Sequence, residues 1–258
     1  ALRLARGRVL ALVLSDVPGD DLGTIASGLF TADSTTFDDA LEAVRDLPVP
    51  EAVRRHLLAG GRGEVPETVK PDDPALARLE ALRIGGVGNA VAAVLAETRR
   101  LGFPGAAGEL SGEAAAAGRE LVRRGRALGM AAGVALVLGG ETTVRLGPAG
   151  STGQGGRNQE LALAAAGELA VPAPDVAGQE LVLTLATDGE DGPTRAAGGV
   201  VDGATWEAIR RAGSDPAGLL ARHDSGTALR LVPGALLETG VTGTNVGDLA
   251  IYLRRPAA

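Results

Sequence analysis

A glycine-rich segment of the sequence combines residue types that could bind an anion. Residues 153–160 read GQGGRNQE and run directly into a helical pattern that ends near Leu169. Three glycines allow the backbone to turn sharply and approach a ligand, and the start of a helix presents free N–H groups and a positive dipole end. Arg157 adds a guanidinium fork and Asn158 an amide, which suits a carboxylate or a phosphate. The segment therefore predicts an anion cradle that includes Gly155 and Gly156.

An acidic turn supplies the complementary chemistry. Residues 187–194 read TDGEDGPT and follow an apolar run over 180–186 that is typical of a buried strand. In open α/β sheets, ligands bind at the carboxyl ends of the strands. Asp188 and Asp191 could hold Mg²⁺, which prefers oxygen ligands, or one of them could accept a proton from a substrate hydroxyl. An anion cradle and a carboxylate pair together predict a phosphorylated ligand with a metal.

Each of these residues also has a structural interpretation. Arg157 could form a salt bridge at the start of its helix, and Asn158 and Glu160 could orient Arg157 or cap the helix. Asp188 and Asp191 could simply form the turn. We expect Arg157, Asp188 and Asp191 to be catalytic, with the two aspartates as tentative metal ligands.

Further polar residues are expected to bind substrate or phosphate. The loop after the first apolar run reads SDVPGDD, in which an acidic group could hold a metal or orient a hydroxyl, or only cap a helix. Glu141 follows another apolar run, and a polar loop occurs near residue 242. The predicted binding residues, beside the two glycines and Asn158, are Ser15, Asp16, Glu141, Thr242, Thr244 and Asn245.

Alternating strand and helix patterns place these loops in an α/β protein. Apolar runs predict strands over 9–14, 134–138, 180–186 and 248–253, the first of them buried on both faces as in a parallel sheet. Helical patterns cover 37–45, 50–60, 90–100, 113–128, 160–169 and 203–212. The arginines of the 113–128 helix are expected to form a solvated face.

Composition excludes several functional classes. The net charge is −7 with a pI near 5.0, and no Lys/Arg run occurs, so we expect neither nucleic acid nor a membrane as partner. No apolar run approaches the roughly 18 residues of a membrane span, and no secretory signal is recognisable. With no cysteine and two histidines, thiolate and histidine-rich metal sites are not expected, and we expect a cytoplasmic protein.

Six motifs in order give the chain a family resemblance. They read SDVPGDDLGTIASG, GGETTVRLG, GQGGRNQELALA, ATDGEDGPT, AAGGVVDG and TGVTGTNVGDL. Together they resemble the glycerate 2-kinases of the MOFRL family, members of which are often labelled hydroxypyruvate reductase. The resemblance implies part of a Rossmann-like α/β/α domain with a parallel sheet at 1–130, a smaller α/β MOFRL domain at 131–258, and an active site in the cleft between them. It also implies transfer of the ATP γ-phosphoryl group to D-glycerate with Mg²⁺, giving 2-phosphoglycerate.

The sequence departs from the family pattern at several places. Family members carry an N-terminal glycine-rich segment with an important lysine, which has no counterpart here, so we expect a fragment or a degenerate member. Leu29-Phe30, Arg195 and the segment 223–226 (HDSG) also differ from the family motifs. Two alternatives therefore stay open, a hydroxypyruvate reductase-type oxidoreductase and a non-catalytic sugar-acid-binding protein. The segment GGVGNA at 85–90 lacks the third glycine of a dinucleotide fingerprint. A monomer or a homodimer is expected.

Overall fold

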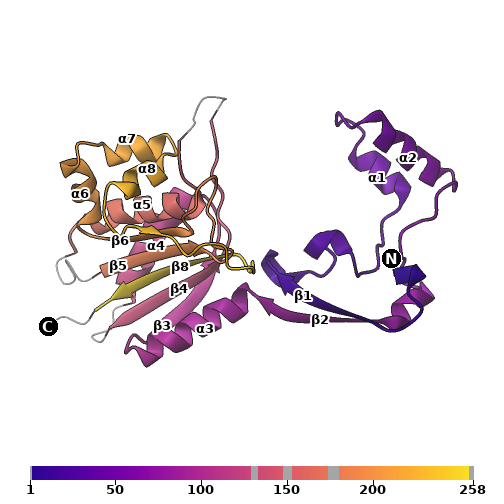
Figure 1. Cartoon of the computed structure of the whole chain (residues 1–258), viewed down its shortest axis with the longest axis horizontal. Coiled ribbons are helices and arrows are strands. Elements are labelled where there is room, and N and C mark those ends of the chain that lie inside the picture. The colour runs from indigo at the N-terminus through magenta and orange to yellow at the C-terminus, as the bar shows by residue number, and fades with distance from the viewer. Residues whose placement is uncertain (1, 129–132, 148–152, 174–179, 256–258) are drawn as a thin grey trace. The chain divides into compact units, whose positions relative to one another are not determined.

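The computed structural model describes residues 2–128, 133–147, 153–173 and 180–255. The chain divides into two compact units (Figure 1). Unit 1 comprises Ala1–Val13 and Gly19–Ile84, and unit 2 comprises Leu14–Pro18 and Gly85–Ala258. Both contain helices and strands, which confirms the predicted α/β class.

Unit 1 contains two helices, α1 (Phe37–Ala43) and α2 (Glu51–Gly61), that pack against each other. Thr36 begins α1 with a reciprocal capping box, in which its side chain accepts from the Asp39 N–H and Asp39 accepts from the Thr36 N–H. Short 3₁₀ turns cover Leu2–Leu4, Pro18–Asp20, Ile25–Gly28 and Pro74–Arg78. His56 is exposed, with its ring edge against Phe37.

A two-stranded sheet pairs β1 (Val9–Ser15) with β2 (Leu79–Gly86). The predicted strand over 9–14 is confirmed, but the prediction that it is buried on both faces is wrong for the described chain. Leu10 and Leu12 are each 58 % exposed. A sheet of two strands offers no neighbouring layer that could remove their side chains from water.

Unit 2 is built on a six-stranded sheet in the order β3-β4-β8-β5-β6-β7. Among the described strands of this sheet, β3 and β4 pair in parallel, and the other neighbouring strands pair antiparallel. Asp248, the first residue of β8, lies opposite both Gly140 and Ala186, the last residues of β4 and β5. The register therefore brings the loops after β4 and β5 to the same edge of the sheet. The strands are β3 (Gly105–Leu110), β4 (Val134–Gly140), β5 (Glu180–Ala186), β6 (Gly198–Asp202), β7 (Leu236–Leu237) and β8 (Asp248–Arg254).

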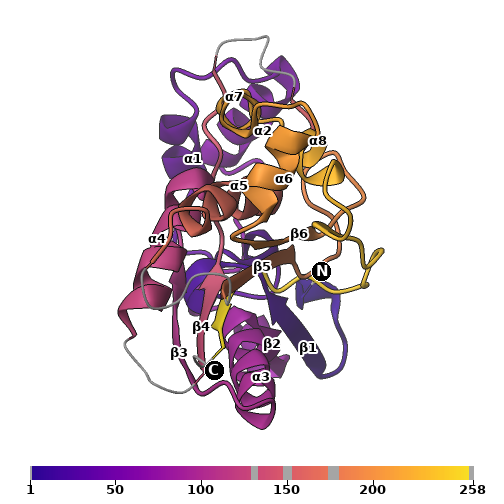
Figure 2. The same ribbon diagram turned by 90° about the vertical axis from the view of Figure 1, so that its left-hand side faces the viewer.

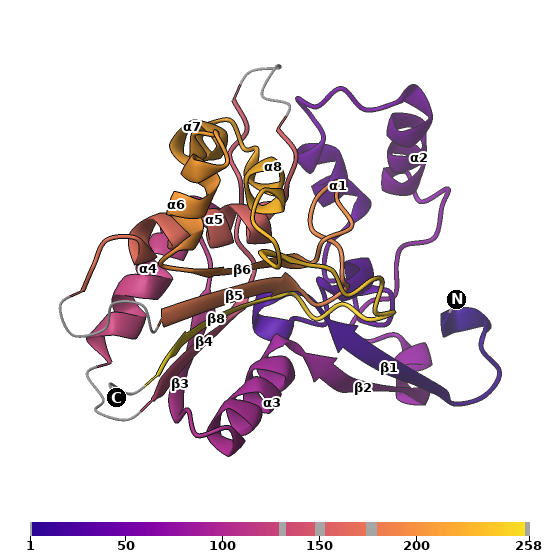
Figure 3. The same ribbon diagram turned by 60° about the vertical axis from the view of Figure 1, so that its left-hand side comes forward.

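Helices cover both faces of this sheet (Figure 3). The helix α3 (Val87–Arg100) packs on one face, and α4 (Ala114–Ala127) and α5 (Arg157–Leu169) pack on the other. The side-chain alternation of β8 follows from this arrangement, because Leu249 and Ile251 join the cluster under α3 while Ala250 and Tyr252 join the cluster under α4 and α5. Three short helices, α6 (Thr205–Arg211), α7 (Pro216–Ala221) and α8 (Ser225–Arg230), contact α5 beyond the sheet (Figure 2).

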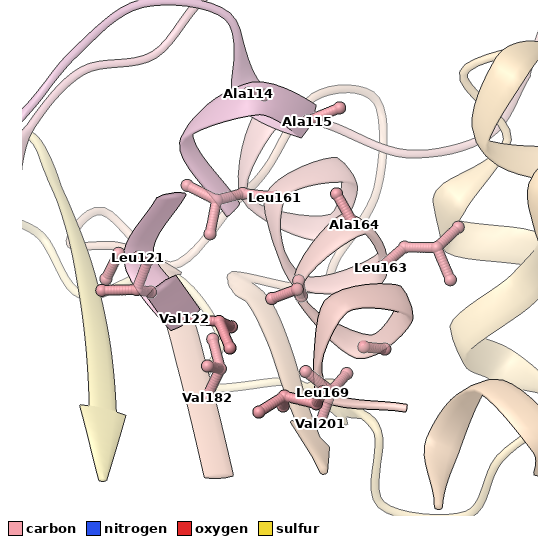
Figure 4. Close-up of a cluster of buried hydrophobic side chains, with 14 of the residues drawn as sticks. Ala114, Ala115, Leu121, Val122, Leu161, Leu163, Ala164, Leu169, Val182 and Val201 are labelled. Atoms are coloured by element: carbon pink, nitrogen blue, oxygen red, sulfur yellow. The ribbon is translucent and has the colours of Figure 1, made fainter. Parts of the chain in front are cut away.

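Helix α5 is the centre of the larger core (Figure 4). Its residues from Asn158 to Ala166 are all buried, as expected for a helix surrounded by other elements on every side. Leu161 points toward α4, whereas Leu163 points to the opposite side of α5, and both belong to this core. Near the other end of the helix, the ring of Trp206 from α6 lies against Gly167. Because α5 is packed on all sides, its orientation is fixed, and the positions of its first residues are fixed with it.

A buried polar cluster lies at the C-terminal end of β8. Glu180 accepts a 2.6 Å hydrogen bond from the Tyr252 hydroxyl and a two-pronged ion pair from Arg126, with Nε and Nη2 at 2.8 and 2.7 Å. We call Arg126, Glu180 and Tyr252 the Glu180 cluster. The predicted solvated arginine face of α4 is thus wrong for Arg126, whose side chain is 18 % exposed. Burial raises the pKa of Tyr252, so the hydroxyl stays protonated and donates.

The predicted domain boundary at 130/131 does not coincide with the division of the structure. Unit 2 begins at Gly85, apart from Leu14–Pro18, and β3 and α4 share the sheet and core of the residues that follow. The tentative boundary segment 129–133 lies mostly outside the described residues. As a boundary between family domains, 130/131 stays a prediction.

Candidate functional site

A polar cavity of about 760 Å³ opens in unit 2 at the edge where β4 and β5 end. Its walls come from the loop after β4, the glycine segment and first turn of α5, the acidic turn after β5, and the turn after α7. The ionisable lining residues are Glu141, Arg157, Glu160, Asp188, Glu190, Asp191 and His223. Six of the predicted site residues meet here: Glu141, Gly155, Gly156, Arg157, Asp188 and Asp191.

Arg157 is held in the cavity wall by two carboxylates. Its Nε and Nη2 atoms donate to Asp248 at 2.5 and 3.2 Å, and its Nη1 lies 2.6 Å from Glu141 Oε1. Burial lowers the pKa of Arg157, but the hydrogen bond to Asp248 and the negative charges of Asp248, Glu141 and Asp191 together outweigh it, so that the pKa is raised. Asp248 is 1 % exposed and Glu141 is 44 % exposed. We call Arg157, Glu141 and Asp248 the Arg157 cluster; its outer carboxylate is the one that an incoming anion can replace.

Asp191 fastens the acidic turn to the start of α5. Its two carboxylate oxygens accept the backbone N–H groups of Asn158 and Gln159 at 3.0 and 2.8 Å. The Gln159 amide also donates to Asp191 Oδ2 at 3.1 Å. These contacts occupy two N–H groups that the sequence predicted to face a ligand, because a carboxylate at a helix N-terminus satisfies them internally. Burial raises the pKa of Asp191 while the two backbone hydrogen bonds lower it, with burial the larger effect.

The two glycines before α5 are required by this packing. A β-carbon on Gly156 would collide with the Asp191 carboxyl, and one on Gly155 would collide with Ser225. Gly155 also has a φ of +148°, which side-chain-bearing residues rarely adopt. The glycine segment therefore lies close to the acidic turn and α8.

Asp188 is the more accessible of the two aspartates. Its side chain is half-buried on the cavity wall, and Oδ1 accepts the Glu190 N–H at 3.1 Å. Its backbone carbonyl accepts the Thr242 N–H at 2.9 Å. The polar loop near residue 242 therefore contacts the acidic turn through this backbone hydrogen bond.

The remaining predicted residues do not line this cavity. The Thr242 hydroxyl donates to the Thr187 carbonyl at 2.6 Å and accepts from the Thr244 N–H. Asn245 donates to Asp16 at 3.3 Å, so these two predicted residues are neighbours on the surface of unit 2. Two others are buried: Ser15, whose hydroxyl bonds with Val17, and Asn158, behind the first turn of α5.

The sequence did not predict His223 as a site residue, whereas Thr142, beside Glu141 at the end of its strand, was expected either to face the site or to be structural. His223 Nδ1 lies 2.9 Å from Glu160 Oε2, and both residues line the cavity. Thr142 is buried, and its hydroxyl has no hydrogen-bond partner among the described residues. The departure at 223–226 was the sequence signal for His223, but only the fold shows that it reaches Glu160, 63 positions away.

The cavity carries an excess of negative charge. Five carboxyl groups line it, against one guanidinium and one imidazole. Burial raises the pKa of Glu160, with Glu113 adding to the effect and His223 opposing it. The described residues contain no group of three or more His, Cys, Asp or Glu arranged to hold a metal ion. A search of the described residues also finds no helix long and apolar enough to cross a membrane.

Two sequence families match the chain. Residues 134–248 match the MOFRL family, and residues 1–58 match a domain of unknown function, DUF4147. The first match contains the whole lining of the cavity.

The relatives bear names of two activities. The chain is 41 % identical to a glycerate 2-kinase of Pyrococcus horikoshii over 97 % of its own length and 57 % of the relative, and 40 % identical to a D-glycerate 2-kinase of Thermotoga maritima over 98 % and 58 %. A protein of Agrobacterium vitis named for hydroxypyruvate reductase is 37 % identical over 95 % and 55 %.

Solved structures agree with the sequence matches. The crystal structure of the Thermotoga maritima glycerate kinase superimposes with a TM-score of 0.82 at 38 % identity, over 98 % of this chain and 58 % of that one. The chain spans somewhat more than half the length of these relatives. Residues 134–248 therefore form a MOFRL family domain, in a chain that is similar over most of its length to proteins named glycerate 2-kinase.

Proposed function

We propose that the protein containing this chain transfers the γ-phosphoryl group of ATP to the 2-hydroxyl of D-glycerate, giving 2-phosphoglycerate. The observation that carries the proposal is the guanidinium of Arg157 on the wall of a polar cavity, in a chain whose relatives include named glycerate 2-kinases. Phosphoryl transfer depends on positioning and charge neutralisation more than on covalent chemistry of the protein. Arg157, which is held by Asp248, supplies both a fixed position and a positive charge.

Arg157 is proposed to bind the glycerate carboxylate or the transferring phosphoryl group. Asp248 fixes the inner edge of the guanidinium, while the contact with the half-exposed Glu141 can be exchanged for an anionic ligand. The exchange keeps the charge on Arg157 paired throughout, because one carboxylate or phosphate oxygen replaces another. Thr142 lies on the same wall, and its buried hydroxyl has no hydrogen-bond partner among the described residues.

Mg²⁺ fits the donor chemistry of the cavity. It keeps several waters and needs only one or two carboxylates, so a cluster of three is not required. Asp188 would hold it, because this carboxylate faces the cavity and accepts only one N–H, whereas both oxygens of Asp191 are engaged with α5. The ion would neutralise phosphate charge in a cavity whose own carboxylates repel a polyanion. Asp191 then acts by holding the acidic turn.

The remaining predicted residues are proposed to support the substrate from the neighbouring surface. Asp16 and Asn245 are in contact, and Thr242 and Thr244 brace the acidic turn. Gly155 and Gly156 allow the first turn of α5 to approach the turn that contains Asp191. A cytoplasmic location and a monomeric or dimeric state stay predictions, as does the placement of the active site in a cleft between domains.

Phosphorus NMR with ATP, Mg²⁺ and D-glycerate tests the reaction. We expect a phosphoglycerate signal whose chemical shift identifies the 2-isomer, and a rate reduced about 100-fold or more by Arg157→Lys, since removal of one oriented donor typically costs that much. Asp188→Asn should raise the Mg²⁺ concentration needed for half-maximal rate. Arg123→Lys, on an exposed ion pair with Glu168, is the control.

The assay is run on this chain and on the natural gene product that contains it. Absence of product from both would overturn the kinase proposal. Loss of NADH absorbance with hydroxypyruvate would then support the oxidoreductase, the activity for which the Agrobacterium vitis relative is named. Glycerate binding without turnover of either kind would support a sugar-acid-binding protein.

A further inference from the structure

A buried glutamate and a histidine form a pair on the cavity wall. Glu160, in the first turn of α5, is 2 % exposed, and its Oε2 lies 2.9 Å from His223 Nδ1. The imidazole is 22 % exposed, and both residues line the cavity that contains Arg157. The glutamate is thus the inner member of the pair and the histidine the one that a ligand can reach.

The backbone holds His223 in an unusual position. His223 follows α7 with a φ of +56°, in the left-handed region that glycine normally occupies after a helix. Its N–H donates to the Leu220 carbonyl at 3.1 Å, and the next residue, Asp224, accepts the Gln154 N–H at 2.8 Å. A left-handed conformation is unfavourable for a residue with a side chain. This backbone conformation places the imidazole of His223 against Glu160.

The contact with Glu160 determines what the other ring nitrogen can do. When an ionised carboxylate accepts from Nδ1–H, Nε2 of the neutral ring carries a lone pair and can accept a proton. No hydrogen bond to Nε2 occurs among the described residues. Glu113, at the start of α4, acts electrostatically on Glu160, and Arg222 and Asp224 flank the histidine in the sequence. The other charged groups that line the cavity are Arg157, Glu141, Asp188, Glu190 and Asp191.

We propose that His223 is a further catalytic residue, which accepts the proton of the substrate hydroxyl at Nε2, and that Glu160 is a positioning residue that fixes its tautomer. The proposal rests on the kinase function proposed above. As the hydroxyl oxygen forms its bond to the γ-phosphorus, the bond from that phosphorus to the bridging oxygen of ATP breaks and ADP leaves. The hydroxyl proton passes to Nε2 and later to water, so charge and atoms balance.

The geometry favours this role over a structural one. A histidine used only to anchor α7 would be expected to be buried with both nitrogens bonded. His223 instead has one nitrogen fixed from within the core and its ring at the cavity surface. The alternative acceptor, Asp188, lies on the same wall, and the variants below separate the two.

Nitrogen NMR of ¹⁵N-histidine-labelled protein tests the tautomer directly. The chain contains only His56 and His223, so two imidazoles give signals, and the variant His56→Gln assigns them. We expect His223 to carry its proton on Nδ1, and D-glycerate to shift the Nε2 signal of His223 but not of His56. Glu160→Gln should change the tautomer ratio of His223. A proton on Nε2, or no response to D-glycerate, would overturn the proposal.

Steady-state kinetics then tests the proton transfer. We expect His223→Gln to lower kcat about 100-fold or more, with KM within a few-fold, and to remove the decline of kcat at low pH, because protonation of His223 no longer switches the base off. His56→Gln should match the wild type. Wild-type turnover reports on the kinase proposal, so an active His223→Gln variant would overturn this inference alone. Loss of the low-pH decline in Asp188→Asn and not in His223→Gln would assign the base to Asp188.

Discussion

The two ends of β8 each carry an arginine–carboxylate cluster, and the two clusters differ in how far they are exposed. At its C-terminal end, Arg126 and Tyr252 surround a Glu180 that is 4 % exposed. At its first residue, Asp248 binds Arg157, whose guanidinium remains on the wall of a cavity. The first cluster is closed by protein groups, and the second has an outer carboxylate, Glu141, in contact with solvent.

The difference shows how one interaction type serves two purposes. A buried pair must be fully hydrogen-bonded, since an unpaired buried charge costs several kcal/mol. The Glu180 cluster meets that condition through hydrogen bonds from two partners, Arg126 and the Tyr252 hydroxyl. In the Arg157 cluster Asp248 is buried, whereas Glu141 is exposed. The guanidinium can therefore exchange Glu141 for another anion at a small cost in free energy. The exposure of Glu141 thus distinguishes the Arg157 cluster, which belongs to the candidate site, from the Glu180 cluster, which is structural.

Removing the carboxylate from each cluster should have the largest effect of the comparison. We expect Glu180→Ala to lower the free energy of unfolding by about 3–5 kcal/mol, because Arg126 and the Tyr252 hydroxyl lose a buried partner. Glu141→Ala should change it by less than about 1 kcal/mol, as for other exposed ion pairs. Urea unfolding followed by circular dichroism measures both. Equal losses would remove the distinction between the clusters.

A smaller effect is expected from adding a methyl group beside the Glu180 cluster. A β-carbon on Gly125 of α4 would collide with the Tyr252 ring, so Gly125→Ala should cost about 1–3 kcal/mol. Gly88 of α3 has nothing within 4 Å of the corresponding position. Gly88→Ala is the matched control and should stabilise by up to about 1 kcal/mol through helix propensity. Thermal unfolding of the pair tests this, and a Gly125→Ala protein as stable as Gly88→Ala would contradict it.

The smallest expected effect on stability is the pH dependence that Glu160 contributes on the cavity wall. Burial raises the pKa of Glu160 above its ordinary 4.5. A carboxyl group with a raised pKa in the folded state contributes stability that is present below the unfolded pKa and lost as the pH rises through the folded one. The wild type should therefore lose stability relative to Glu160→Gln as the pH is raised from below 4.5. Urea unfolding over a pH series measures the difference, and a gap that stays constant would contradict the raised pKa.

Much of the fold was predictable because local patterns and packing agree. The apolar run over 180–186 coincides with β5, and the helical patterns over 90–100, 113–128 and 160–169 match the bounds of α3, α4 and α5 to within three residues. Strand β3 was missed because its sequence, GAAGEL, contains no β-branched or aromatic residue. It is a strand because it pairs with β4, an interaction that only the assembled sheet provides.

The candidate site was predictable in its residues more than in their relations. The glycines and Arg157 identified the segment 153–160 as a candidate site in the sequence, and the structure places this segment on the cavity wall. That Asp191 caps α5, and that His223 meets Glu160, depends on contacts over more than 30 positions. Such contacts leave no spacing signal in the sequence.

The packing of Trp206 against Gly167 has a practical consequence for optical measurements. Trp206 and Tyr252 are the only tryptophan and tyrosine of the chain, and both belong to unit 2. Tryptophan and tyrosine absorbance and tryptophan fluorescence therefore come from unit 2 alone, whereas far-ultraviolet circular dichroism records both units. Fluorescence quenching at Trp206 would follow the release of α5 from α6, and a dichroism change that precedes it would be the optical signature of unit 1 melting first.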